Sequence, residues 1–593
     1  MSRKPHVNFQ FFMAATVNTS FVGILRVILL TALCLFSFAP GSIVWSQEPV
    51  PTPTPFVDPI SPADVIPAPL PNDPPPVAPN FASPLRPMPS SERIGVSADQ
   101  PLTLTLDGAI QLALDNNNDI DTVRREKQIS EFRLMSARGV YDPFIAAESY
   151  YERASTPTAS AIGGAVNGAV TQTRFFGSGG ISGLSPRFGG SYSARLDASR
   201  TTTSNTNAFL NPQFPSILAL GYTQPLWRGL RIDNQRRVIE ISKRNIAITD
   251  SQLRQQAIDV VAGVERAYWD LVFAMRNLQV QIDAVRQARD QFESNRRQVE
   301  RGVLAPIELV AAGAQITTLE QAVYSAQESV TRAENTLKTL MLPDRNAPEW
   351  QRAITPVSVV EIDTPTLGLE ASLAEALRNR PELDQLAETA AINEIDKRFF
   401  RDQTKPEINL VGTYTSQGLA GTETPAAINP TTGLSRVPPN LVGGFGQSFT
   451  NLLQQDYPTF RVGITIGIPW GNRVAKANLG IAEVEGARIR DLRDRAEQLI
   501  EAEVRNALQA LRSAEARLAS ARATRVAAEQ LAESEERQFR AGTTTFYLVQ
   551  QRQLELVTAR SRELQARTDL NKAISDLHRV LGRTLVENNI ELR

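Results

Sequence analysis

Few residues of this 593-residue chain could carry acid–base or nucleophilic chemistry. The sequence holds two histidines, His6 and His578, and one cysteine, Cys34. His6 and Cys34 fall in a segment that we expect to be removed, which would leave one imidazole and no thiol. A histidine-based active site, a multi-histidine metal site, a disulfide and a thiolate nucleophile are therefore not expected.

Carboxylates are abundant, with 63 acidic residues against 62 basic ones and a formal net charge of −1. No acidic pair stands in a distinctive local motif, so an enzyme built on paired carboxylates has little support. The balanced charge provides no field that would attract nucleic acid. We expect no catalytic residue, no cofactor, no metal and no nucleic-acid partner.

Residues 1–46 are typical of an export signal peptide. Arg3 and Lys4 precede the apolar run VILLTALCLFSF at 27–38, which is too short for a bilayer-spanning helix. Ser46 is a plausible cleavage position, and an uncleaved anchor helix is the alternative. No later segment is long and apolar enough to cross a membrane as a helix, so a membrane role would use β-strands or partners.

The rest of the chain divides at two linkers. Residues 47–100 are rich in proline, as in PTPTP and NDPPPVAP, which predicts an extended, disordered segment. Residues 343–366 form a second linker between two halves, 101–342 and 367–583. A short C-terminal tail, 584–593, follows the second half.

The two halves read as tandem repeats. LTLDGAIQLALDNNNDI at 104–120 matches LGLEASLAEALRNRPEL at 367–383, and TQPLWRG at 223–229 matches GIPWGNR at 467–473. Each copy predicts a short helix, a medium helix, a strand, a loop, a strand, a very long helix, a break and a long helix. The first copy is longer because of a Gly/Ser/Thr-rich stretch at 155–210, which reads as loop.

The predicted strands have one apolar and one polar face, with a period of two residues. They are 144–153, 216–227, 407–417 and 458–470. In the second copy the apolar face holds Ile408, Leu410, Tyr414, Phe460, Val462, Ile464, Ile466 and Ile468. This pattern suits a transmembrane β-barrel whose apolar face meets lipid, although a soluble sandwich strand alternates in the same way. Trp227 and Trp470, at strand ends, would lie at the bilayer interface.

The long helices carry narrow apolar stripes. From Asn234 to Glu300 there is no proline, and Leu253, Ala257 and Val260 begin a series with spacings of three and four. Such stripes suit coiled-coil seams, and a helix of this length spans about 100 Å. A cytosolic coiled coil is the alternative, but it would explain neither the strands nor the signal.

The stretch RGVLAPIEL at 301–309 interrupts the first long helical region, and RAGTTTFYL at 540–548 occupies the same context in the second copy. Glycine and proline are the residues least compatible with a helix interior. We interpret both breaks as turns at the far ends of long helical hairpins. The turn residues are Arg301, Gly302, Pro306, Ala541 and Gly542.

Four strands per chain are too few to close a membrane barrel, which needs about eight. Open strand edges are not tolerated in lipid, so the strands must close by oligomerisation. The long helices would then form a multi-chain tube next to the barrel. The predicted fold class is therefore mainly α, with a transmembrane β-barrel contribution from a duplicated repeat.

The order LTLDGAIQLAL, YTQPLWRGL, long helix, glycine break and returning helix resembles the outer membrane efflux protein (TolC) family over about residues 101–583. The resemblance implies a homotrimer in which four strands per protomer complete a 12-stranded barrel in outer membrane lipid, on a long α-helical periplasmic barrel. It implies the exit duct of a tripartite efflux pump or a type I secretion system. The partners would be a periplasmic adaptor (membrane fusion) protein, which contacts the two turns, and an inner-membrane transporter.

The resemblance also implies an entrance gate beside the turns. The best studied member of the family has an acidic residue six positions after the first turn glycine, and Glu308 has that spacing here. The Tyr, Arg and two Asp of that member's second repeat correspond to Phe539, Thr544, Leu548 and Gln551. The ion-pair latch and double acidic ring are thus not expected, and we predict a tip closed by packing. Glu308 is either a gate residue or a charge that favours the start of a helix.

The competing interpretation is a non-conducting periplasmic or cell-surface coiled-coil structural protein. An inner-membrane adaptor would share the signal and the helical hairpin but not the strands. The sequence leaves open the exported substrate, the pump class, and whether 155–210 adds an extracellular hairpin.

Overall fold

The computed structural model describes residues 87–90, 92–159, 161–165, 167–357 and 368–591. The expected signal peptide and most of the proline-rich segment lie outside the described residues. Within the described part, β1 (Ser97–Leu104) already begins inside the segment expected as linker.

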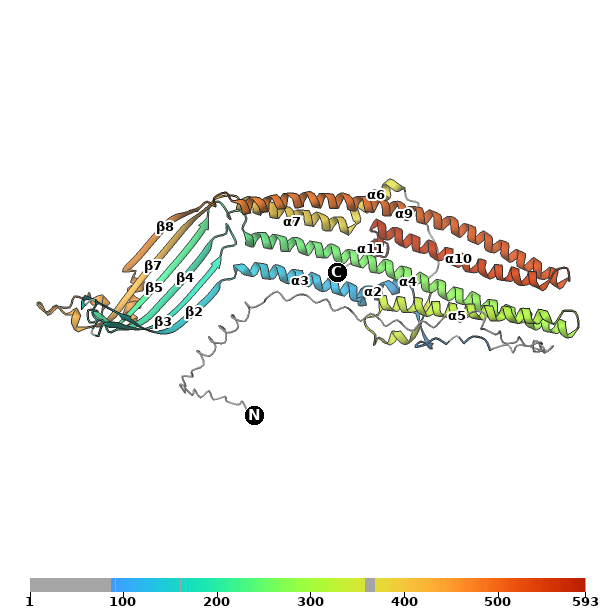
Figure 1. Cartoon of the computed structure of the whole chain (residues 1–593), viewed down its shortest axis with the longest axis horizontal. Coiled ribbons are helices and arrows are strands. Elements are labelled where there is room, and N and C mark those ends of the chain that lie inside the picture. The colour runs from blue at the N-terminus through green and yellow to red at the C-terminus, as the bar shows by residue number, and fades with distance from the viewer. Residues whose placement is uncertain (1–86, 91, 160, 166, 358–367, 592–593) are drawn as a thin grey trace, which may run out of the picture. The chain divides into compact units, whose positions relative to one another are not determined.

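Eight helices follow the predicted order of short, medium, very long and long in each half (Figure 1). Those of the first half are α2 (Leu106–Asn116), α3 (Asn118–Arg138), α4 (Asn234–Glu300) and α5 (Ile307–Met341). Those of the second half are α6 (Leu369–Asn379), α7 (Pro381–Gln403), α9 (Arg473–Arg540) and α10 (Phe546–Leu581). The first very long helix has the predicted bounds.

Side-chain caps fix where α2 and α3 begin. The hydroxyl of Thr105 accepts a hydrogen bond from the Gly108 amide at 3.1 Å and starts α2. The side chain of Asn117 accepts from the Asp119 amide at 2.9 Å at the start of α3. Such residues satisfy amide groups that have no partner within the first helical turn.

A buried ion pair fixes the segment between the two halves. Lys338 and Glu334 on α5 are almost completely inaccessible, and their charged atoms lie 2.7 Å apart. The Lys338 ammonium also donates to the carbonyls of Trp350 and Arg352 at 2.8 and 2.7 Å. Arg352 starts β6 (Arg352–Pro356), which pairs in parallel with β1. The buried ammonium is thus hydrogen-bonded by two carbonyls, and the Glu334 carboxylate lies between the cations of Lys338 and Arg93, which offset its burial.

The main sheet is an antiparallel meander of six strands, in the order β2-β3-β4-β5-β7-β8. Figure 1 shows these strands side by side and inclined to the helices. Their bounds are β2 (Phe144–Pro157), β3 (Ala169–Leu184), β4 (Ser191–Thr203), β5 (Leu210–Pro225), β7 (Glu407–Glu423) and β8 (Tyr457–Gly467).

The prediction of four strands per protomer is wrong, because the sheet of one chain has six. Strands β3 and β4 lie in the 155–210 stretch that we predicted to be loop, and they belong to the sheet along their whole length. Glycines on both faces of β3 and the adjacent Phe175 and Phe176 interrupt the alternation that marks a strand. In addition, β8 ends at Gly467, so Ile468 and Trp470 lie beyond it rather than within it.

The helices pack in a row whose core is the predicted apolar stripes. Helix α3 packs on α4, α7 contacts both α4 and α9, and α10 contacts both α9 and α4. The α4 residues Leu253, Ala257, Val260 and Val264 are buried, as are Val504, Leu508, Leu511 and Ala514 on α9. Among the described helices, none is both long and apolar enough to cross a membrane.

One testable consequence concerns His578, which is half-buried on α10. Burial lowers the pKa of its imidazole below the ordinary value, and the carboxylates of Glu587 and Glu265 oppose this only in part. The unfolded chain therefore binds this proton more readily than the folded chain. The resulting stability is present above the unfolded pKa of about 6.5 and is lost as the pH falls below it.

We expect the melting temperature to fall between pH 7.5 and pH 5.5, and to fall less in a His578→Gln variant. Differential scanning calorimetry of both proteins across this range measures the difference. Equal pH slopes for the two proteins would contradict the assignment.

Candidate functional site

The register of the sheet sorts its side chains onto two faces, because directly paired residues share a face. Tyr414 pairs with Phe460, Leu410 with Ile464, and Ile408 with Ile466. The same face continues through β5 to β2. Its apolar members include Ile145, Tyr151, Phe175, Ile181, Leu196, Leu218, Leu220, Tyr222 and Val462.

This apolar face is open in the single chain. Phe460 and Val462 are 75% and 78% exposed, and Ile464 and Ile466 are also exposed. Beyond the strand ends, Ile468 and Trp470 are exposed, as is Trp227 after β5. An apolar surface that spans several strands is rare on a protein surrounded by water and indicates an apolar partner.

The opposite face is polar, and in the first half it is charged. It holds Thr413, Thr415, Gln417, Thr459, Arg461 and Thr465 in β7 and β8. In β2 to β4 it holds Glu148, Glu152, Arg174, Arg195 and Asp197. The guanidinium of Arg195 contacts Asp197 at 2.5 Å and Glu148 at 3.5 Å. A hollow of about 260 Å³ on this face is lined mainly by polar side chains, among them Glu152, Gln172, Arg174, Thr201 and Gln213.

A short helix, α8 (Phe445–Gln454), covers the apolar face where β5 and β7 are furthest from the long helices. Its polar side faces the sheet: the hydroxyls of Ser448 and Ser216 lie 2.8 Å apart, and Asn451 donates to the Leu419 carbonyl at 2.9 Å. Its other side exposes Phe445, Phe449 and Leu453. A helix with its apolar stripe turned away from the protein has the arrangement expected in apolar surroundings.

The two predicted turns have the same backbone conformation. Gly302 and Gly542 have φ values of 73° and 74°, in the left-handed region that glycine adopts without a steric cost. The amide of Gly302 donates to Val299 at 2.9 Å and that of Val303 to Gln298 at 3.0 Å. The second turn repeats this pair of bonds, from Gly542 to Phe539 and from Thr543 to Gln538, both at 3.0 Å. This is the Schellman ending of a helix, made twice.

The predicted gate residues lie beside these turns, with contacts that are local. Glu308 is half-buried in the first turn of α5, two positions after Pro306, which occupies the N-cap. Among the ion pairs of the described residues, none includes Glu308, and those nearest the turns, such as Arg296–Glu300 and Arg540–Glu536, join residues of one helix.

At the second turn, two aromatic rings lie against each other. The ring of Phe539 lies 6.0 Å from that of the buried Phe546. The Thr544 hydroxyl donates to Glu535 at 2.5 Å, and the Gln551 amide donates to Glu555 at 3.3 Å. Leu548 is exposed. The turns are exposed at Arg301, Gly302, Pro306, Ala541 and Gly542.

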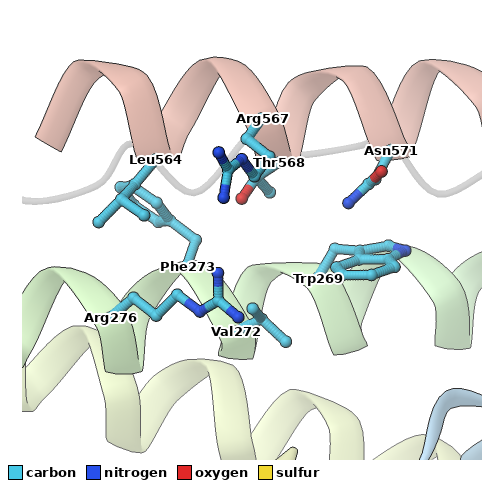
Figure 2. A pocket seen from close by; sticks show the side chains of 8 residues that line it. All are labelled: Trp269, Val272, Phe273, Arg276, Leu564, Arg567, Thr568 and Asn571. Atoms are coloured by element: carbon cyan, nitrogen blue, oxygen red, sulfur yellow. The ribbon is translucent and has the colours of Figure 1, made fainter. Parts of the chain in front are cut away.

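The seam between the two halves leaves little room for a ligand. Trp269, Phe273 and Arg276 on α4 face Leu564, Arg567 and Asn571 on α10 (Figure 2). The hollow among them is about 10 Å³, enough for one water molecule. In the part of the chain that the structure describes, no three His, Cys, Asp or Glu side chains gather as a metal site would require.

Comparison with known families matches this chain to the outer membrane efflux protein model over residues 182–341 and 373–583. The chain belongs to the outer membrane efflux protein family. The family consists of channels rather than enzymes, and membership supports an efflux channel of the outer membrane. The matched residues begin within β3, so β2 and most of β3 lie outside the match.

Solved structures of outer-membrane channels have the same fold as this family member. The channel OprN aligns with a TM-score of 0.56 at 15% identity, covering 84% of this chain and 98% of its own. CmeC of Campylobacter jejuni gives 0.56 at 15%, covering 82% and 90%. The open state of MtrE from Neisseria gonorrhoeae gives 0.53 at 15%, covering 85% and 98%. Among curated proteins, none matches the sequence significantly.

The turn glycines provide a test of the tip structure. A Cβ at Gly542 would meet no atom within 4 Å, so Gly542→Ala adds only the strain of the left-handed backbone. We expect the turn to open more easily by about 1–2 kcal/mol. Native-state hydrogen exchange of residues 536–548 measures this opening.

Gly480→Ala on α9 is the matched control, because this glycine also has open space around it but lies within a helix. That change should stabilise its surroundings by about 0.5–1 kcal/mol. The same sign for both variants would contradict the left-handed turn.

Proposed function

We propose that this chain is the passive exit duct of a tripartite efflux pump or type I secretion system. It would act as a homotrimer that conducts substrate from an inner-membrane pump across the periplasm and the outer membrane. The observation that carries the proposal is a sheet with one apolar and one polar face, joined directly to helices of about 100 Å.

Trimer closure is supported by the two borders of the sheet. Strands β2 and β8 each have a neighbour on one side in the six-stranded sheet. Backbone groups at such edges cannot stay unpaired in lipid. Pairing β8 of one copy with β2 of the next satisfies both edges and, when it repeats around an axis, closes a ring.

The helices next to these borders carry matching apolar stripes. Close to β2, α3 exposes Ile129, Phe132 and Met135. Close to β8, α9 exposes Val474, Ile481 and Val484. Helices α3 and α9 are the two ends of the row α3-α4-α7-α9, so the same ring would bury both stripes against each other.

The tip supports the proposed contact with a periplasmic adaptor. Both turns are exposed, and apolar side chains stand beside them: Val303 and Ile307 at the first, and Tyr547 and Leu548 at the second. Exposed apolar residues at corresponding places of two hairpins provide a repeated surface for a partner. The inner-membrane transporter would act through this adaptor.

Purified protein in planar bilayers tests the proposal against the alternative of a structural coiled-coil protein. A duct gives discrete conductance steps and migrates as a heat-sensitive trimer. If the protein neither conducts nor forms such an oligomer, the structural coiled-coil interpretation holds instead.

The orientation of the sheet predicts opposite effects at two neighbouring positions. Ile464 lies on the apolar face of β8, so Ile464→Arg would place a charge in lipid at a cost of about 2–4 kcal/mol near the bilayer centre. Thr465 lies on the polar face, so Thr465→Arg should assemble as the unmodified protein does. The yield of the heat-sensitive trimer in outer membranes measures both. Loss of trimer with Thr465→Arg and not with Ile464→Arg would reverse the assigned faces.

The gate is predicted to close by packing rather than by charge. Removal of the Phe539 ring in Phe539→Ala should raise the resting conductance of the channel, because it removes the contact with Phe546. Glu308→Ala should change this conductance less, since Glu308 has no ion pair among the described residues. Single-channel recordings compare the two. A larger effect from Glu308→Ala would instead assign the latch to that carboxylate.

A further inference from the structure

We propose that the assembled barrel has 18 strands and a correspondingly wide exit, rather than the 12 strands that the family resemblance implies. The inference rests on the proposed trimer, because three copies of a six-stranded sheet make the ring. It requires that β3 and β4 stand in the barrel wall rather than extend beyond it.

Strand pairing places β3 and β4 in the wall. Pairing between β2 and β3 runs without interruption from Phe144–Ser182 to Pro157–Ala169. Strand β4 pairs with β3 from Leu184–Ser191 to Gln172–Thr203. The hairpin is therefore as tall as its neighbours and continues both of their faces.

The turn of this hairpin is held at the junction of sheet and helices. Residues 185–190 make the turn, and the Gln224 side chain donates to the Phe188 carbonyl at 2.8 Å. Gly189 lies so close to α4 that a Cβ there would come within 2.8 Å of an Asp233 carboxylate oxygen and of the Gly229 carbonyl oxygen. Asp233 is the N-cap of α4. Strands β3 and β4 thus extend along the full height of the sheet, as far as its junction with the long helices.

The width of the helical row is closer to that of six strands than to that of four. Strands about 4.8 Å apart and tilted by about 45° each occupy about 6.8 Å of a barrel's circumference. Six strands then cover about 41 Å, and four would cover about 27 Å. The row of α3, α4, α7 and α9 covers about 32–40 Å at the usual interaxial distance of 8–10 Å. Six strands therefore continue the helical tube without narrowing.

A ring of 18 such strands is about 39 Å across between backbones, whereas 12 strands give about 26 Å. Side chains of the polar face would line this lumen, and charged groups of β2 to β4 stand on it. The wall would admit large hydrated solutes that a 12-stranded barrel excludes, so this step of the path would not select by size among small molecules.

Inter-subunit distances test the width. A spin label attached at Thr465→Cys, on the polar face of β8, occurs once in each subunit. The three labels of a trimer form a triangle, and pulsed electron paramagnetic resonance measures the distance between two of them. Eighteen strands predict about 34 Å between backbones, and 12 predict about 23 Å. A distance near the shorter value, in the protein that keeps residues 160–204, would overturn the proposal by itself.

Deletion of residues 160–204 provides the matched comparison. It removes β3 and β4 together, leaves β2 antiparallel to β5, and keeps Phe144 level with Gly221, since Phe144 is level with Ser182, Ser193 and Gly221 in successive strands. We expect the Thr465→Cys distance to shorten by about one third in the deletion variant.

A label at Asn506→Cys on α9 is the control, because the helical tube keeps its width in both proteins. Equal Thr465→Cys distances with and without the hairpin would overturn the wide barrel and leave the duct intact. Absence of any inter-subunit distance at Asn506→Cys in the unmodified protein would instead contradict the trimer of the proposed function. If the deletion variant fails to assemble, the distance in the unmodified protein still decides.

Discussion

Unpaired backbone at the two borders of the sheet is the constraint on which the rest of the structure depends. Water can satisfy the free amides and carbonyls of an edge strand, whereas lipid cannot. Because the apolar face of this sheet runs across all six strands, its border strands β2 and β8 meet the same apolar surroundings as the strands between them. The need for an edge partner therefore connects the sheet to the apolar stripes of α3 and α9, which stand beside the same borders.

The helical part must hold two long hairpins together without a wide globular core. Polar groups cross the seam between α4 and α10: Ser561 donates to Asn277 at 2.8 Å, and Lys572 forms an ion pair with Asp270. Each contact is local and fixes the alignment of the two helices along their length. Together with narrow apolar stripes, such contacts allow a row of helices that is one layer thick.

Periodicity in the sequence predicted the long helices, the two turns and the four strands β2, β5, β7 and β8. The turns were predictable because glycine and proline act through the backbone itself, at Gly302, Pro306 and Gly542. Strand β3 was missed because glycines contribute to neither face. Strand β4 does alternate, with Tyr192, Ala194 and Leu196 on the apolar face, but its small and polar residues resemble those of a loop.

The sequence predicts those parts of the candidate site that depend on the alternation of apolar and polar residues along a strand. It does not predict the parts that depend on which elements pack against each other. The predicted lipid-facing residues of β7 and β8 share one face, as the period of two requires. The outward stripe of α8, by contrast, spans too few residues to be distinguished from loop. The contacts of the gate residues depend on which helices lie side by side, and the sequence alone does not determine that.

The short helix α11 (Thr584–Glu587) has a consequence for the order of assembly. Leu585 packs into the apolar cluster of the first half, among Tyr268 and Leu271, and Asn588 donates to the buried carboxylate of Glu265 at 2.9 Å. A chain that is synthesised and exported from its N-terminus thus cannot complete the core of its first half until these late residues arrive. The two halves mature as a single unit, and a prematurely ended chain would retain an unfilled core in the part that was made first.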